Sequence, residues 1–199
     1  MSEAHQKIGR KLSYCRIALQ YYVAGRFAFL AQYFPVSGNL FHHALEMLLK
    51  GDLASQGLTD SDLRKRSHCL PDLWRDFLTH HPSLDVEKYN KTVEQLHGWD
   101  DIRYPGRVDN PVMLFDRQMT ETKLDILGPD LSEENKYRIN LEEMDLLIHE
   151  ILRWTSVNPN YVRFFLRSKV AWDVYFSENR HAASSAPLAD REEWPFLMD

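Results

Sequence analysis

The amino-acid sequence predicts an all-α fold: an antiparallel bundle of five or six helices with a loop-rich insertion at about residues 105–139. Three observations predict this class. Apolar residues recur three and four positions apart over most of the chain, as on one face of an amphipathic helix. Proline, glycine and serine separate these segments, so the connections between neighbouring helices are short. A single apolar run, Val112 to Phe115, suits a short strand and is too little for a sheet.

The first two helices are predicted at residues 11–33 and 37–50. The first ends before Pro35, because proline disfavours helical backbone in the residue that precedes it. Ser37 is expected to cap the second helix with its hydroxyl, and Gly51 is its natural C-terminal stop. So short a connection makes the two helices antiparallel neighbours.

Two further helices are predicted before the insertion. Pro71 suits the first turn of one helix, which the sequence His80-His81-Pro82 closes. Ser83 opens the next helix, which ends before Tyr104-Pro105.

The C-terminal third is expected to hold two helices and a tail. Asn140 and Glu143 resemble a capping box at the start of one helix, and Asn158-Pro159 starts the last helix, which runs through Tyr175. Residues 182–199 are expected to form a flexible C-terminal tail, which leaves residues 1–181 as a single helical domain.

The charge of the chain limits its partners. The net charge of −5 argues against binding to duplex DNA, because affinity for phosphates comes mainly from clustered Lys and Arg. Residues 1–75 nevertheless hold 10 Lys and Arg against 6 Asp and Glu, so the first third of the chain has room for a local basic surface.

The cysteines and the hydropathy pattern predict a cytoplasmic protein without a membrane segment. Cys15 and Cys69 cannot make a disulfide framework or a four-thiolate zinc site, which favours a reducing compartment. The longest apolar stretch, residues 21–34, is interrupted by an arginine and a glutamine and is too short to span a bilayer.

Histidine and glutamate residues raise the question of a metal site. His42, His43 and Glu46 lie within one helical turn, and Glu94 with His97 forms a Glu-x-x-His pair on another helix. Bundle-core di-metal sites are built in this way but use more carboxylates. Hydrogen-bonded histidines are therefore expected here, and no metal or other cofactor is assigned.

No nucleophile or phosphate-binding motif is present in the sequence. There is no Gly-x-Ser-x-Gly sequence and no Gly-rich phosphate loop. Arg75 followed by His80 fits one ribonuclease spacing, although such pairs also arise by chance in a chain of this composition. These two residues are the weak catalytic candidates.

Three segments in order resemble the HEPN superfamily of small helical domains. They are PVSGNLFHHALEMLLKG at 35–51, SHCLPDLW at 67–74 and LHGWDDIRYP at 96–105. The resemblance implies a helical bundle, often dimeric. HEPN proteins divide into metal-independent ribonucleases and non-catalytic members that bind nucleotides or partner with nucleotidyltransferases.

The resemblance favours a member without nuclease activity. The nuclease members carry an arginine followed by four to six residues and then a histidine, which can exchange a proton with a ribose hydroxyl. At the matching turn this chain has Arg103, but Val108, Asp109 and Asn110 stand where the histidine is expected. Arg75 and His80 lie in a different part of the predicted fold.

A non-catalytic binding module is therefore the leading prediction, with a nucleotide, an RNA or a protein as partner. The predicted pocket lies between two helices and is lined by Asn39, His43, Glu46, Lys50, His97, Arg103 and Tyr104. Arg and Lys would hold phosphate, and tyrosine could stack on a base. The same residues could instead form an internal network that fixes helix packing. A ribonuclease is the alternative function, and a bundle metal protein is a lesser one.

A homodimer is also expected. Aromatic residues make up 12 % of the chain, more than a six-helix bundle of this size readily hides. The HEPN resemblance separately implies pairing of protomers.

Overall fold

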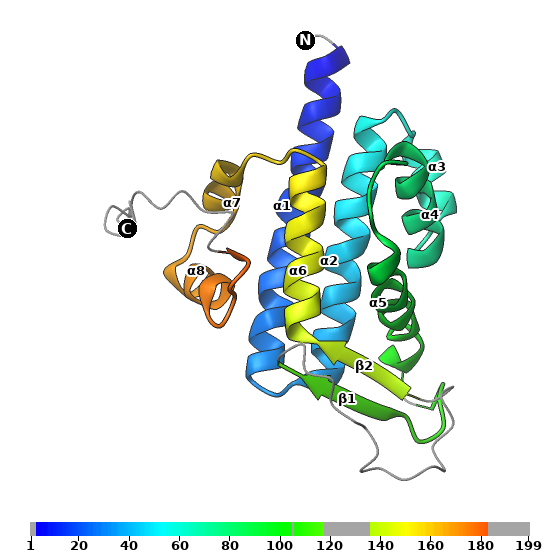
Figure 1. Cartoon of the computed structure of the whole chain (residues 1–199), viewed down its shortest axis with the longest axis vertical. Helices are drawn as coiled ribbons and strands as arrows, with labels where there is room; N and C mark the ends of the chain where they lie inside the picture. Colours follow the sequence, from blue (N-terminus) through cyan, green and yellow to red (C-terminus); the bar gives the residue numbers. More distant parts are fainter. Residues whose placement is uncertain (1–2, 105, 118–135, 183–199) are drawn as a thin grey trace.

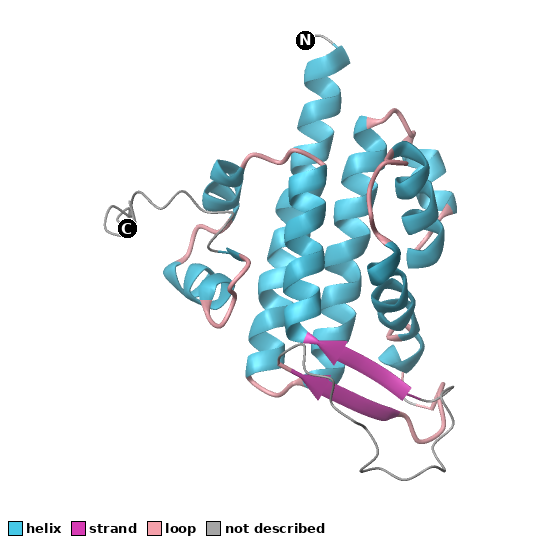
Figure 2. Cartoon of the chain, in the orientation of Figure 1, coloured by secondary structure: helices cyan, strands magenta, loops and turns pink. Residues whose placement is uncertain are grey.

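The computed structural model describes residues 3–104, 106–117 and 136–182 of the chain. It confirms the predicted all-α class, since helices make up most of the described residues and the strands form one short sheet (Figure 2). Three helices form the centre of the bundle: α1 (Glu3–Leu30), α2 (Phe34–Ser55) and α6 (Leu141–Trp154). To one side lie α3 (Asp60–Lys65), α4 (Leu70–His80) and α5 (Glu87–Gly98), and to the other α7 (Pro159–Phe165) and α8 (Lys169–Phe176) (Figure 1).

Among the described elements, α1 and α2 pack together most extensively. Two predicted boundaries of α2 are wrong. Ser37 does not cap α2, because it lies inside the helix, where its hydroxyl donates to the carbonyl of Phe34 at 2.8 Å. Pro35 instead occupies the first turn of α2. Gly51 does not end α2 either, because the helix continues to Ser55 and buries Leu53 and Ala54.

The elements that follow α2 also differ from the sequence prediction at their starts. The short helix α3 was not predicted. It begins with a capping box in which Thr59 accepts from the backbone N–H of Asp62, and Asp62 accepts from that of Thr59. Pro71 lies in the first turn of α4 as expected, and α4 ends at His80. The helix α5 begins at Glu87 and not at Ser83, and a 3-10 turn η1 (Asp101–Arg103) follows it.

The insertion contains two strands that pair in parallel at one end of the bundle (Figure 2). Strand β1 (Val112–Asp116) contains the predicted apolar run, and strand β2 (Lys136–Asn140) was not predicted. Residues 118–135 between them lie outside the described part of the chain. Asn140 ends β2 and caps α6 by accepting from the backbone N–H of Glu143 at 3.0 Å, which confirms the predicted helix start.

The predicted last helix is two helices. A break at residues 166–168 separates α7 from α8, and Ser168 caps α8 by accepting from the backbone N–H of Ala171 at 3.0 Å. Of the predicted tail, Ala182 is described and fully buried, and residues 183–199 lie outside the described part.

A buried polar network ties α1, α6 and α8 together. Asp145 on α6 accepts from the Arg26 guanidinium and, at 2.5 Å, from the Tyr22 hydroxyl. Arg26 also donates to the carbonyls of Val174 and Ser177 around α8. Because Arg26 and Asp145 are both almost fully buried, the hydrogen bonds and the opposite charge are what make their burial tolerable.

The central helix α2 is buried around most of its circumference from Leu48 to Ala54. In the described part of the chain, no helix combines the length and the hydropathy that crossing a membrane requires.

Candidate functional site

The sequence-predicted polar residues of α2 converge on one carboxylate, Glu46. One oxygen, Oε1, accepts from Lys50 Nζ at 2.5 Å. The other, Oε2, accepts from His43 Nδ1 at 3.2 Å and from His68 Nδ1 at 3.0 Å. His43 and Lys50 reach Glu46 because residues three and four apart share a helix face. His68 comes from the connection between α3 and α4.

Glu46 is ionised at neutral pH although it is almost fully buried. Burial alone would raise its pKa, but hydrogen bonds from His43, Lys50 and His68 outweigh burial and lower the pKa to about 2. Lys50 is also fixed, because its ammonium donates to the carbonyl of Ser67 at 2.7 Å. The Glu46–Lys50 pair therefore joins α2 to the α3–α4 connection.

His42 lies beside these residues and is more deeply buried. Its Nδ1 is 3.0 Å from the carbonyl oxygen of Leu96 on α5. A carbonyl can only accept, so Nδ1 carries the ring proton and Nε2 presents a lone pair. Within the described part of the chain that Nε2 is buried and has no hydrogen-bond partner. Burial lowers the pKa of His42, so the ring is neutral at pH 7. We call His42, His43, Glu46, Lys50 and His68 the Glu46 cluster.

Three other residues considered for the pocket or for a metal site do not join the Glu46 cluster. Asn39 is half-buried on α2, and its amide donates to the carbonyl of Pro35 at 3.1 Å. Glu94 is exposed on α5. The ring of His97 lies 6.2 Å from that of His42, and its Nδ1 is a second buried nitrogen that has no hydrogen-bond partner among the described residues.

Arg103 and Tyr104 form a separate surface at the end of η1. Tyr104 is 55 % exposed, and the guanidinium carbons of Arg103 and Arg107 lie 5.6 Å and 5.4 Å from the centroid of its ring. Arg107 reaches the ring because the chain turns at Gly106, which has a φ of 84°, and the Arg107 backbone N–H donates to the Tyr104 carbonyl at 3.3 Å. Arg103 also donates to Asp100 at 3.2 Å. We call Arg103, Tyr104 and Arg107 the Tyr104 platform.

Comparison of the chain with protein-family models, curated proteins and solved structures finds no match. The resemblance to the HEPN superfamily therefore stays a prediction.

The two catalytic candidates from the sequence, Arg75 and His80, do not point toward one common position. Arg75 and His80 are both exposed on α4, and Arg75 donates to Asp72. Five residues along an α-helix correspond to a rotation of about 140°, so the two side chains project in different directions. A single phosphate would not meet both.

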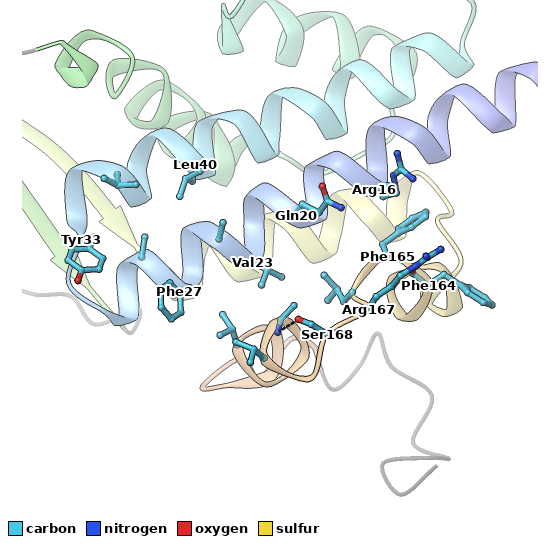
Figure 3. A pocket seen from close by; sticks show the side chains of 17 residues that line it. Arg16, Gln20, Val23, Phe27, Tyr33, Leu40, Phe164, Phe165, Arg167 and Ser168 are labelled. Atoms are coloured by element: carbon cyan, nitrogen blue, oxygen red, sulfur yellow. Dashed lines mark hydrogen bonds between the residues drawn. The ribbon is translucent and has the colours of Figure 1, made fainter. Parts of the chain in front are cut away.

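A mostly apolar hollow lies elsewhere in the described part of the chain. It has a volume of about 880 Å³ between α1, the start of α2, and α7 and α8, and none of the predicted pocket residues lines it. Figure 3 shows Phe27 and Val23 of α1 beside this hollow and Phe164 and Phe165 of α7 at its other end. Phe27 and Phe164 are 53 % and 64 % exposed. We call this the α1–α8 groove.

Proposed function

We propose that this chain is a HEPN-like binding module without nuclease activity, and that it binds a nucleotide or a single-stranded RNA at the Tyr104 platform. The observation that carries the proposal is an exposed tyrosine ring with a guanidinium on each side of it in sequence, both within 6 Å of the ring centroid. Aromatic rings stack on bases without much sequence preference, and arginine binds phosphate through paired N–H donors.

The Tyr104 platform suits phosphate better than the Glu46 cluster does. Lys50 already neutralises Glu46 and donates to the carbonyl of Ser67, so its charge is not available to a ligand. Arg103 pairs with Asp100 at a partly exposed position, where an ion pair is worth about 1 kcal/mol or less. A doubly charged phosphate can displace such a partner.

Two features support binding without cleavage. Arg75 and His80 project in different directions from α4, and no histidine follows Arg103 at positions 108–110. A 2′-hydroxyl held near Arg103 would therefore have no imidazole from these positions to take its proton.

The test is fluorescence anisotropy of a labelled oligoadenylate with the full chain at a fixed salt concentration. Stacking contributes about 1–3 kcal/mol per base, so Tyr104→Ala should weaken binding about tenfold or more. Arg103→Ala and Arg107→Ala should each weaken binding and reduce its salt dependence.

Matched controls separate the platform from a general loss of charge or aromatic surface. Arg75→Ala removes an exposed arginine that, like Arg103, pairs with an aspartate three residues before it. Tyr161→Ala removes a partly exposed tyrosine on α7. Both should bind like the parent chain. Equal affinity of parent and Tyr104→Ala would refute the proposal, and RNA cleavage in EDTA that His80→Ala abolishes would establish the ribonuclease alternative.

We further propose that the module is a cytoplasmic homodimer. Cys15 and Cys69 are both free thiols, in keeping with a reducing compartment, and fractionation of the native host cell tests the location. The α1–α8 groove supports pairing, because contiguous exposed apolar surface commonly marks a protein interface.

A further inference from the structure

We propose that His42, His43, Glu46 and His68 bind one zinc ion. The proposal is independent of nucleotide binding at the Tyr104 platform, because the two sites share no residue. Four side chains of the Glu46 cluster would supply the ligands, and Lys50 would stay on the second oxygen of Glu46.

Three of the four proposed ligands place a donor atom near one common point, and the fourth, His68, lies outside that group of three and approaches it through Glu46. His42, His43 and Glu46 each offer a ligand atom, and these atoms all lie within 4.8 Å of one another. The Nδ1 atoms of His43 and His68 lie 3.2 Å and 3.0 Å from Glu46 Oε2. Two ligands of a tetrahedral zinc ion, each bonded at about 2.1 Å, are themselves about 3.4 Å apart. Zinc could therefore replace the two hydrogen bonds, provided that the His68 ring moves toward the other three ligands.

The buried lone pair of His42 is the second, independent observation. Its Nε2 is unprotonated, buried and without a hydrogen-bond partner in the described part of the chain. Native proteins rarely leave a buried polar atom without a partner, so such an atom calls for an explanation. Metal-binding histidines commonly donate their other ring N–H to a backbone carbonyl, and His42 Nδ1 donates in this way to Leu96.

The donor set selects zinc among common metal ions. Three imidazoles and one carboxylate form a nitrogen-rich site, which suits zinc and other late transition metals better than calcium or magnesium. Four protein ligands satisfy the tetrahedral coordination typical of structural zinc. His42, His43 and Glu46 come from α2 and His68 from the α3–α4 connection, so zinc would fasten that connection to the bundle.

His97 is the alternative candidate for the fourth zinc ligand. Its ring lies 6.2 Å from that of His42, and its buried Nδ1 has no hydrogen-bond partner among the described residues. Among the described residues, no hydrogen bond joins His97 to Glu46, whereas His68 is hydrogen-bonded to it. The structure therefore favours His68 as the fourth ligand, and variants of both residues test that choice.

The test uses the full chain, expressed without a polyhistidine tag, stripped with EDTA and titrated with Zn²⁺ against a chromogenic chelator. We expect one equivalent of bound zinc and a higher thermal midpoint with zinc than without it. His43→Ala, His68→Ala and Glu46→Gln should each weaken zinc binding at least tenfold. His97→Ala and the control His80→Ala, which changes an exposed histidine of α4, should bind zinc like the parent chain.

Two of the proposed ligands, His43 and His68, lie at partly exposed positions, so their variants can be tested even if a buried variant does not fold. His68 has a side chain that is 53 % exposed and His43 one that is 20 % exposed, so these two variants should fold even if Glu46→Gln does not. Circular dichroism of the metal-free variants checks this. Failure of the parent chain to bind a full equivalent would overturn the proposal. Parent-like affinity in both His43→Ala and His68→Ala would overturn it too, as would a tenfold loss in His97→Ala.

Discussion

The two most buried histidines of the described chain are held as the same tautomer by backbone carbonyls. His42 Nδ1 donates to Leu96, and His149 Nδ1 donates to Asp145 at 2.6 Å. Nε2 is therefore an acceptor in both rings. In His149 it accepts from the Tyr175 hydroxyl at 2.9 Å, whereas in His42 it has no hydrogen-bond partner among the described residues. The difference explains why His42 suits a ligand role and His149 a structural one.

His149 makes the stability of the fold depend on pH. Burial lowers its pKa to about 4, and the nearby charges of His181 and Arg26 act in the same direction. The pKa in the unfolded chain is about 6.5, so as the pH falls from 6.5 to 4 the unfolded state binds the proton first. The free energy of unfolding should then fall by about 3 kcal/mol from this residue alone. Urea unfolding at pH 7 and at pH 4 measures the change.

The variant His149→Gln isolates this contribution, because glutamine keeps hydrogen-bonding capacity and does not titrate. The variant should be less stable than the parent chain at pH 7 and should lose about 3 kcal/mol less between pH 7 and pH 4. If parent and variant lose the same amount, His149 is not the group that couples folding to protons.

At the residue scale, the sequence predicts contacts along one helix better than contacts between segments. The grouping of His42, His43 and Glu46 follows from helical spacing, and the structure confirms it. His68 was not predicted to join them, because its contact with Glu46 depends on how the α3–α4 connection folds back. Arg107 was also missed, although the sequence Arg-Tyr-Pro-Gly-Arg at 103–107 could have indicated a turn that brings two arginines to one tyrosine.

At the element scale, glycines set how closely α2 approaches its neighbours. A Cβ at position 51 would lie 2.8 Å from the Cβ of Tyr14 on α1, and one at position 38 would collide with the ring of Trp99. Trp99 is fully buried and follows directly on α5. Replacing either glycine would force α2 away from a packed partner.

A pair of glycine substitutions tests this packing. Gly38→Ala should destabilise the protein by about 1–3 kcal/mol, because the added methyl group displaces Trp99 and outweighs the gain in helix propensity. Gly9→Ala is the matched control, since Gly9 is also helical but a Cβ there would meet no atom within 4 Å. It should raise stability by up to about 1 kcal/mol. Denaturant unfolding measures both, and an equal gain in the two variants would contradict the proposed close contact.

Predicted element boundaries are correct where the signal is local and wrong where tertiary packing decides. Gly51 was expected to end α2 because glycine is common after a helix, but here it serves close packing against α1. Asn140 was predicted correctly because its capping contact is local. Strand β2 was missed because it holds only two alternating apolar residues, Tyr137 and Ile139, and its partner lies in a distant segment. Local signals were thus predictable, and tertiary packing decided the rest.

At the scale of the whole molecule, polar and apolar features lie on different sides of the central helices. The Glu46 cluster lies where α2 meets the connection between α3 and α4, and α5 supplies the carbonyl that holds His42. The α1–α8 groove lies where α1 meets α7 and α8, which Figure 1 shows on the other side of the bundle. This separation would leave the polar sites accessible in an assembly that buries the groove.

The exposed apolar residues of the α1–α8 groove lead to a prediction about assembly. A second copy of the chain would cover Phe27 and Phe164, so light scattering at micromolar concentration should give twice the 23.5 kDa mass of one chain. Phe27→Asp should shift the mass toward 23.5 kDa, because a carboxylate buried in an apolar interface without a partner is costly. Ile8→Asp is the control, since Ile8 lies on the same helix, is 57 % exposed and does not line the groove. A parent mass of 23.5 kDa would rule out the homodimer, and dissociation by both variants would place the interface along α1 as a whole and not in the groove.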